Sequence, residues 1–239
     1  MKAPSKIMLA IRSAVFFLGM VVTVVLYTPI AIAAWPMHHA RRYVVIGGWA
    51  RFIVWWLKVT CNLTHRVSGM DDLPDSPHVM LSKHQSAWET IVFQTIFPSQ
   101  AWVLKKELLK VPFFGWGLAA SHPIAIDRSR GIKALDGIVK QGIVSLKEGR
   151  SVLVFPEGHR MDPGESGKFN PGGAMLAVRA GVQVVPVAHN AGLFWRRRGF
   201  LKYPGVIDLR VGPPIDTAGK KARQINEEAR QWIEGAFDA

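Results

Sequence analysis

Two motifs in the chain contain residues that can move a proton or bind a phosphate. The first is a His-x4-acid unit, His84 and Glu89, which follows the apolar residues 79–81. An imidazole has its unperturbed pKa near neutrality, so a histidine at this position can act as a general base toward an alcohol. A carboxylate bonded to the other ring nitrogen would fix the tautomer and stabilise the imidazolium. Residues five apart on a continuous helix point about 140° away from each other, so the pair requires His84 to precede the helix.

Glu89 has a second interpretation. Ser86 and Glu89 have the spacing of a capping box, in which a serine caps a helix and an acid three residues later reaches back to its N–H. The sequence leaves capping and catalysis open as roles for this carboxylate.

The second motif is Phe155-Pro156-Glu157-Gly158-His159-Arg160, which follows another apolar run. Gly158 permits close approach of the backbone to a ligand, and Arg160 offers a planar fork of donors for a phosphate. The alternative is a tight turn in which Glu157 and Arg160 only pair with each other. Two further predicted strands also end in basic residues: Lys105 and Lys106 follow residues 101–104, and Arg128 follows residues 124–126. Together these predict one anion-binding site beside His84.

Other chemistry has weaker support. Residues 164–168 lack the second glycine of a nucleophile elbow and the spacing of a Walker A loop, which argues against covalent serine catalysis and nucleotide hydrolysis. His38 and His39 lie beside an apolar segment, and no Cys/His spacing suits zinc, so no metal site is predicted. The single Cys61 excludes an internal disulfide and fits a reducing compartment.

Charge and hydropathy predict a membrane-surface partner. The chain has 30 Lys+Arg against 17 Asp+Glu, a net charge of +13, which favours a polyanion. Residues 13–35 are uncharged and mostly apolar, and as a helix they would span about 34 Å. Residues 43–59 are apolar but carry Arg51 and three tryptophans, which is typical of an interfacial helix. Residues 194–200 mix aromatics with arginines, as lipid anchors do, although nucleic acid is an alternative partner.

Basic residues flank the first apolar segment on both sides, so both ends favour the cytoplasmic face. We therefore expect a helical hairpin that enters one leaflet and returns. A single membrane span and a cleavable export signal are the alternatives.

The chain divides into membrane-associated helices at residues 1–67 and a catalytic domain at residues 68–239, joined by a polar connector that begins at residue 68. In the second part short apolar strands alternate with helices, which predicts an α/β fold with a mostly parallel sheet flanked by helices. Strands are expected at residues 78–81, 101–104, 124–126, 151–155, 184–187 and 206–211, and helices at 87–97, 131–147, 174–180 and 220–237. Both motifs fall at the carboxyl ends of strands, where sites form in such folds.

With these motifs, residues 54–211 resemble the 1-acyl-sn-glycerol-3-phosphate acyltransferases, the lysophosphatidic acid acyltransferases. His84 matches the family's catalytic base, and Glu89 stands where the family more often has Asp. Asp127 and Arg128, the run from Phe155 to Gly158 with Arg160, and residues 184–187 match the later blocks in order. Asn170 follows Phe169 where the family often has lysine, and Lys168 precedes it instead, so one phosphate contact of the family lacks its usual residue.

The resemblance implies a glycerol-phosphate acyltransferase-like fold and transfer of a fatty acyl group to the sn-2 hydroxyl of lysophosphatidate, giving phosphatidic acid. His84 and Glu89 would be catalytic, and Lys105, Arg128, Glu157, Gly158 and Arg160 would bind the substrate. The donor would be an acyl-CoA or acyl carrier protein thioester as co-substrate, with no resident cofactor. The family also implies the cytoplasmic face of the inner membrane, with membrane lipids as partners, acyl carrier protein as a further candidate partner, and no nucleic acid. The alternatives are another lysolipid acceptor, such as a lysophospholipid or lyso-ornithine lipid, or a non-catalytic protein that binds anionic lipid.

Overall fold

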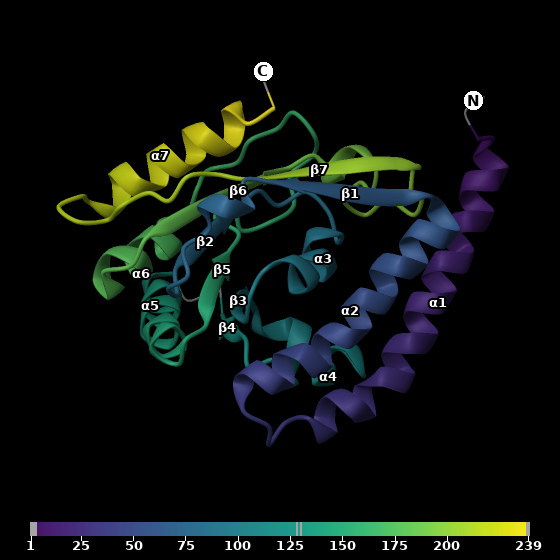
Figure 1. Cartoon of the computed structure of the whole chain (residues 1–239), viewed down its shortest axis with the longest axis horizontal. Helices are drawn as coiled ribbons and strands as arrows, with labels where there is room; N and C mark the ends of the chain where they lie inside the picture. The colour runs from purple at the N-terminus through teal and green to yellow at the C-terminus, as the bar shows by residue number, and fades with distance from the viewer. Residues whose placement is uncertain (1–3, 128, 130, 238–239) are drawn as a thin grey trace.

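The computed structural model describes residues 4–127, 129 and 131–237 of the 239-residue chain. Its centre is a seven-stranded sheet in the order β1-β7-β6-β2-β5-β3-β4 (Figure 1). The strands are β1 Leu63–Ser68, β2 Val79–Ser82, β3 Gln100–Lys105, β4 Ile124–Ile126, β5 Ser151–Val154, β6 Val184–His189 and β7 Gly205–Val211. All neighbouring pairs are parallel except β6 and β7, so the predicted α/β class with a mostly parallel sheet is confirmed.

Helices cover both faces of the sheet (Figure 1). The helices are α1 Lys6–Ala33, α2 His39–Cys61, α3 Glu89–Ile96, α4 Phe114–Ala120, α5 Ile132–Lys147, α6 Gly172–Ala180 and α7 Ala222–Gly235, with short 3-10 turns that include η2 Lys106–Lys110. Side chains along a strand alternate between two separate cores. Met80 on β2 joins α2 and α3 in one core, whereas its neighbours Val79 and Leu81 join α5, α6 and α7 in the other.

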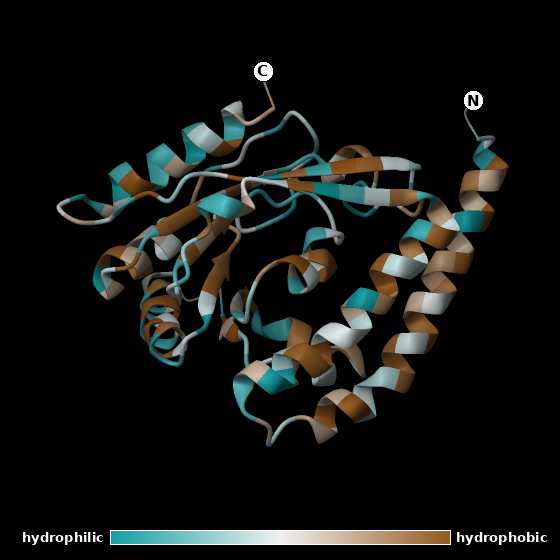
Figure 2. Cartoon of the chain, viewed as in Figure 1, coloured by the Kyte–Doolittle hydropathy of each residue, from teal (hydrophilic) through white to brown (hydrophobic). Residues whose placement is uncertain are grey.

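The two N-terminal helices form an antiparallel pair whose turn is closed by Arg42. The Arg42 guanidinium donates to the carbonyls of Trp35 and Met37, at 2.9 and 3.3 Å, just beyond the end of α1. A cation is favourable there because the last carbonyls of a helix have no partners within the helix. Both helices are long and apolar enough to cross a membrane by length and composition. Figure 2 shows apolar residues along most of α1.

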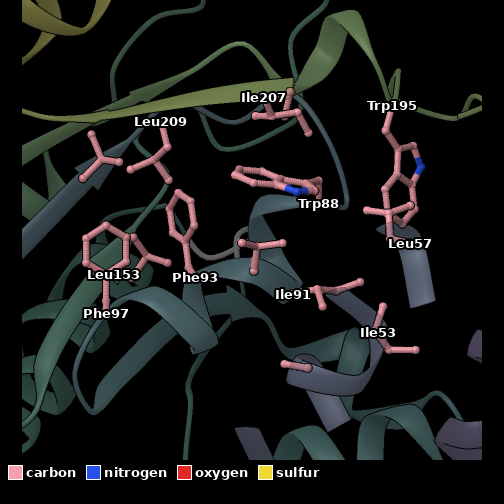
Figure 3. Close-up of a cluster of buried hydrophobic side chains, with 14 of the residues drawn as sticks. Ile53, Leu57, Trp88, Ile91, Phe93, Phe97, Leu153, Trp195, Ile207 and Leu209 are labelled. Carbon is pink, nitrogen blue, oxygen red and sulfur yellow. The ribbon is translucent and has the colours of Figure 1, made fainter. Parts of the chain in front are cut away.

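The hairpin also contributes to the core of the sheet. Figure 3 shows Ile53 and Leu57 of α2 in the same cluster as Ile91 of α3, Trp195 and Ile207. Ile53 and Leu57 are almost completely buried. One face of α2 therefore packs against the catalytic domain, while α1 leaves a long row of apolar side chains exposed.

Two elements were not predicted. Residues 63–68 form β1, an edge strand that pairs with β7 along its whole length. This strand lies on the N-terminal side of the predicted boundary at residue 67, but it belongs to the sheet. A single left-handed residue, Asn62, ends α2 and separates it from β1, so the connection is too short to be recognised as a loop. Residues 114–120, expected to be part of a connection, form α4.

The shared core predicts that α2 stabilises the whole protein. Ile53→Ala should lower the free energy of unfolding by about 2–5 kcal/mol, because it opens a cavity between α2 and the catalytic domain. Denaturant unfolding in detergent measures this, with Val144→Ala on the exposed face of α5 as the control. An unchanged midpoint for Ile53→Ala would show that the hairpin folds independently.

Candidate active site

The carboxyl ends of β2, β5 and β6 lie side by side and carry the main candidate residues. His84 follows β2, Glu157 follows β5, and His189 is the last residue of β6. β2 is paired in parallel with both of its neighbours, so the three chain segments leave the sheet at the same edge. The topology alone therefore brings residues 84, 157 and 189 together from distant parts of the sequence.

His84 lies in a turn between β2 and α3, and Glu89 is the first residue of α3. The Nδ1 atom of His84 is 2.8 Å from Oε1 of Glu89. An ionised carboxylate can only accept hydrogen bonds, so Nδ1 carries the proton and Nε2 keeps its lone pair. The arrangement meets the geometric requirement of a general base oriented by an acid.

Glu89 also holds the backbone of the turn. Its Oε1 accepts from the backbone N–H groups of Gln85 and Ser86, at 2.8 and 2.7 Å, so one oxygen bonds three donors. The Ser86 hydroxyl accepts from the N–H of Trp88 at 3.1 Å. The acid half of the capping box is thus present, and the two interpretations of Glu89 describe one side chain that does both.

Glu89 is fully buried, which alone would raise the pKa of its carboxyl. Interactions with His189 and His84 and the hydrogen bond from Ser86 outweigh burial and hold this pKa below its usual value. The carboxylate is therefore ionised at neutral pH and is available to stabilise an imidazolium at His84.

His189 is a neighbour that the motifs did not reveal. Its Nε2 lies 3.0 Å from the Lys83 carbonyl and 3.9 Å from Oε2 of Glu89, and its Nδ1 accepts from the N–H of Ala191 at 3.3 Å. These partners define the neutral form with the proton on Nε2. Burial lowers the pKa of His189, which agrees with a neutral ring.

The backbone around His84 is fixed on both sides. The His84 N–H donates to Oε2 of Glu157 at 3.0 Å, and its carbonyl accepts from the N–H of Met161 at 2.8 Å. The N–H of Lys83 donates to the carbonyl of Val187 at 3.0 Å. The Phe155 ring stacks on the imidazole with centroids 4.1 Å apart. These contacts leave the imidazole little freedom to turn.

Glu157 was expected to bind substrate, but its carboxylate is buried and bonded to protein groups. Besides the His84 N–H, it accepts from Nζ of Lys83 at 2.7 Å, and Lys83 also donates to the carbonyl of Glu165. Lys83 and Glu157 thus form a buried ion pair next to the turn that carries His84. Its geometry indicates a positioning role for Glu157, and the substrate-binding role stays a prediction.

The remaining predicted residues surround one opening. His84, Lys105, Gly158 and Arg160 line a cavity of about 380 Å³, a size typical of ligand sites. Its other walls are mostly apolar, with Trp102, Leu104, Ile91 and Phe155 among them. The structure therefore combines a histidine oriented by a carboxylate, two cations and an apolar chamber.

Arg160 is suited to an anionic ligand. Among the described residues its guanidinium forms no salt bridge, and its backbone carbonyl accepts from the Arg197 guanidinium at 2.6 Å. Burial lowers the pKa of Arg160, and the charge of Glu89 acts in the opposite direction. A guanidinium keeps its charge even so, because its pKa starts far above neutrality.

Arg128 lies outside the described residues. Its neighbour Asp127 accepts from Nζ of Lys106 at 2.6 Å and from the N–H and hydroxyl of Ser129. The hydrogen bonds from Lys106 and Ser129 hold the pKa of Asp127 well below its usual range. Lys106 is thus engaged by a carboxylate, whereas Lys105 is half exposed and lies 3.9 Å from Glu107.

Comparisons with known proteins relate the chain to acyltransferases. A family model described as Acyltransferase matches residues 64–190, which contain every candidate residue. The chain is 42% identical to a 1-acyl-sn-glycerol-3-phosphate acyltransferase of Pseudomonas aeruginosa over 94% of this chain and 89% of that protein. It is 32% identical to the enzyme of the same name from Saccharomyces cerevisiae over 73% of this chain and 59% of that protein.

The fold defined by these matches is that of an acyltransferase domain. The chain belongs to the 1-acyl-sn-glycerol-3-phosphate acyltransferase family, as the order of its motifs indicated. The crystal structure of the 1-acyl-sn-glycerophosphate (LPA) acyltransferase of Thermotoga maritima has the same fold, with a TM-score of 0.78, 22% identity and coverage of 95% of this chain and 94% of that one.

The double role of Glu89 gives a first prediction for the site. Glu89→Gln should lower turnover by about 10²-fold or more, because an amide cannot stabilise the imidazolium or enforce the tautomer. Ser86→Ala should instead lower the free energy of unfolding by about 1 kcal/mol with near-normal turnover, because it removes only the bond to Trp88. Steady-state rates and unfolding midpoints of both variants measure this. Near-normal turnover in folded Glu89→Gln would show that this carboxylate only caps the turn and has no catalytic role.

Substitutions in the buried ion pair distinguish a positioning role for Glu157 from a substrate-binding role. As a positioning residue, Glu157→Gln should reduce kcat with little change in KM for the lysolipid, and it should destabilise the fold by about 3–5 kcal/mol by leaving Lys83 unpaired. Adding Lys83→Met should recover part of the lost stability but not the rate. A rise in KM without a loss of kcat would instead identify Glu157 as a substrate ligand.

Proposed function

We propose that this chain acylates the sn-2 hydroxyl of 1-acyl-sn-glycerol-3-phosphate with a fatty acyl thioester, giving phosphatidic acid. The observation that carries the proposal is the His84 imidazole, oriented by Glu89 and opening into an apolar cavity that Arg160 and Lys105 also line. Related enzymes named for this reaction, from a bacterium and a yeast, support the choice of acceptor.

Nε2 of His84 removes the proton from the sn-2 hydroxyl as its oxygen attacks the thioester carbonyl. The tetrahedral intermediate then collapses, the C–S bond breaks, and the imidazolium returns the proton to the leaving thiolate. Glu89 stabilises the transient positive charge on the ring. The acceptor itself is the nucleophile, so the protein forms no acyl intermediate.

The phosphate of the acceptor binds the cations at the strand ends. Arg160 donates a planar fork to two phosphate oxygens, and Lys105 and Arg128 complete the charge. Gly158 has a positive φ of 74°, a conformation that favours glycine, and without a side chain its backbone can approach the glycerol. The donor is the thioester of coenzyme A or of acyl carrier protein, used as a co-substrate.

The helical hairpin seats the enzyme in one leaflet at the cytoplasmic face of the inner membrane. The exposed apolar row along α1 supports this location, as do the basic residues that flank the apolar stretch of α1 on both sides. Both substrates carry long acyl chains, so a site held at the membrane surface meets the acceptor without extracting it into water.

A thiol-release assay with lysophosphatidate and acyl thioesters of several chain lengths tests the activity. His84→Ala should reduce turnover by at least about 10²-fold while the protein still folds, because only the general base is lost. His65→Ala, a substitution in β1 outside the cavity, is the matched control. Release that does not depend on added lysophosphatidate, or a folded His84→Ala variant with normal rates, contradicts the proposal.

A further inference from the structure

The chain between β3 and β4 forms an exposed apolar segment that the catalytic proposal does not use. η2 ends at Lys110 and α4 begins at Phe114. Val111, Phe113 and Trp116 are 43%, 39% and 47% exposed, so three large apolar side chains face outward within six residues. An apolar cluster of this kind on a protein surface marks an interaction site.

The backbone of this segment is strained at Phe113, whose side chain is exposed. Phe113 has φ 61° and ψ −65°, and the N–H of Phe114 donates to the carbonyl of Pro112 at 2.7 Å. This is a classic γ-turn, which is rare and strained for a residue with a side chain. Gly115 follows this turn and has no space for a side chain, because a Cβ there would lie 2.5 Å from the Leu109 carbonyl oxygen. Strain that a structure maintains at its surface indicates a function for the exposed side chain.

The segment lies against the hairpin, beside the cavity. The Thr28 hydroxyl of α1 donates to the Phe113 carbonyl at 3.1 Å, and Trp35 packs edge-on to His122 with centroids 5.5 Å apart. α4 itself packs against α1. Phe114, on the same turn, lines the His84 cavity. The apolar surface of α1 therefore continues through α4 to the cavity.

The charges around the segment suit phospholipid headgroups. Lys105 precedes η2 and Lys110 ends it, and both side chains are exposed; Lys106 is paired with Asp127, and Glu107 is the one acidic residue in η2. Lysines that flank an apolar surface bind the anionic headgroup layer while the apolar side chains enter the acyl chains. A bilayer leaflet fits this pattern better than an acidic protein does. An acidic protein surface would pair with the lysines but would leave the aromatic side chains exposed.

We propose that η2 and α4 form a third membrane-contacting element, which inserts Val111, Phe113 and Trp116 among the acyl chains of one phospholipid leaflet. The inference rests on the proposed seat of the hairpin in that leaflet. Because the element lies between α1 and the cavity, the lysolipid enters from the leaflet past α4 and reaches His84 with its chain still among lipid chains. The element is thus the entrance for the acceptor as well as an anchor.

Site-specific labelling tests the contact in the full chain. Trp116→Cys is labelled with the fluorophore NBD and reconstituted on vesicles of phosphatidylcholine and phosphatidylglycerol. Cys61 is buried, so the new thiol is the reactive one. We expect blue-shifted emission that spin-labelled lipids quench. Water-like, unquenched emission at this position overturns the proposal.

Two further labels separate this result from the location of the hairpin. Leu26→Cys on α1 is 68% exposed and reports whether the hairpin enters the leaflet, and Val144→Cys on α5 is 55% exposed and should remain in water. Insertion at residue 26 without insertion at 116 rejects the third element alone. A water-like signal at both positions rejects the membrane seat on which it rests.

The entrance role is tested by rates. Phe113→Ser with Trp116→Ser should slow acylation of vesicle-embedded lysophosphatidate by about tenfold, because less apolar surface holds the entrance in the leaflet. Neither side chain lines the cavity, so the rate with a short-chain, monomeric lysophosphatidate should match that of the control Val144→Ser. An equal loss with both acceptors, or no loss with vesicles, contradicts the entrance role. A native chain inactive toward every lysophosphatidate rejects the proposed activity itself.

Discussion

The hydrogen bond between Nδ1 of His84 and the carboxylate of Glu89 depends on a short turn between β2 and α3. The two residues are five apart and would point away from each other on one helix. The chain avoids this by ending β2 at Ser82 and starting α3 at Glu89. The turn is stable because the same carboxylate accepts from its backbone N–H groups, so the side chain that orients the base also shapes the loop that carries it.

The strands and helices around the turn stabilise the position of His84. β5 and β6 each supply a buried polar group, Glu157 and His189, which bonds the backbone beside His84. Buried charges require partners, and Lys83 supplies one for Glu157. The helical hairpin contributes from the opposite direction, because α2 fills the core under α3 while α1 and α4 present apolar surface near the cavity. The catalytic domain and the apolar helical hairpin thus share one core.

The sequence predicted the strands well because parallel strands that are buried on both faces read as short apolar runs. The bounds of residues 124–126 agree, and the others differ by one to a few residues at their ends. β1 escaped prediction because it is a mostly polar edge strand, with three consecutive polar residues at its centre, and only Asn62 separates it from α2. Residues 84, 158 and 160 were recognisable from strand-end position and residue type. Lys83 and His189 were not recognisable, because they matter through their burial against Glu157 and Glu89, which only the fold determines. The place of His189 just after a predicted strand was the one available signal.

The tautomer of His84 is the most direct test of this account. Nitrogen NMR of the ¹⁵N-histidine-labelled protein, with His84→Gln to assign the resonance, distinguishes the two neutral forms of the ring. The account predicts that neutral His84 carries its proton on Nδ1 and that Glu89→Gln weakens this preference. A ring protonated on Nε2 in the native protein would contradict it, because that nitrogen would then have no lone pair with which to accept the substrate proton.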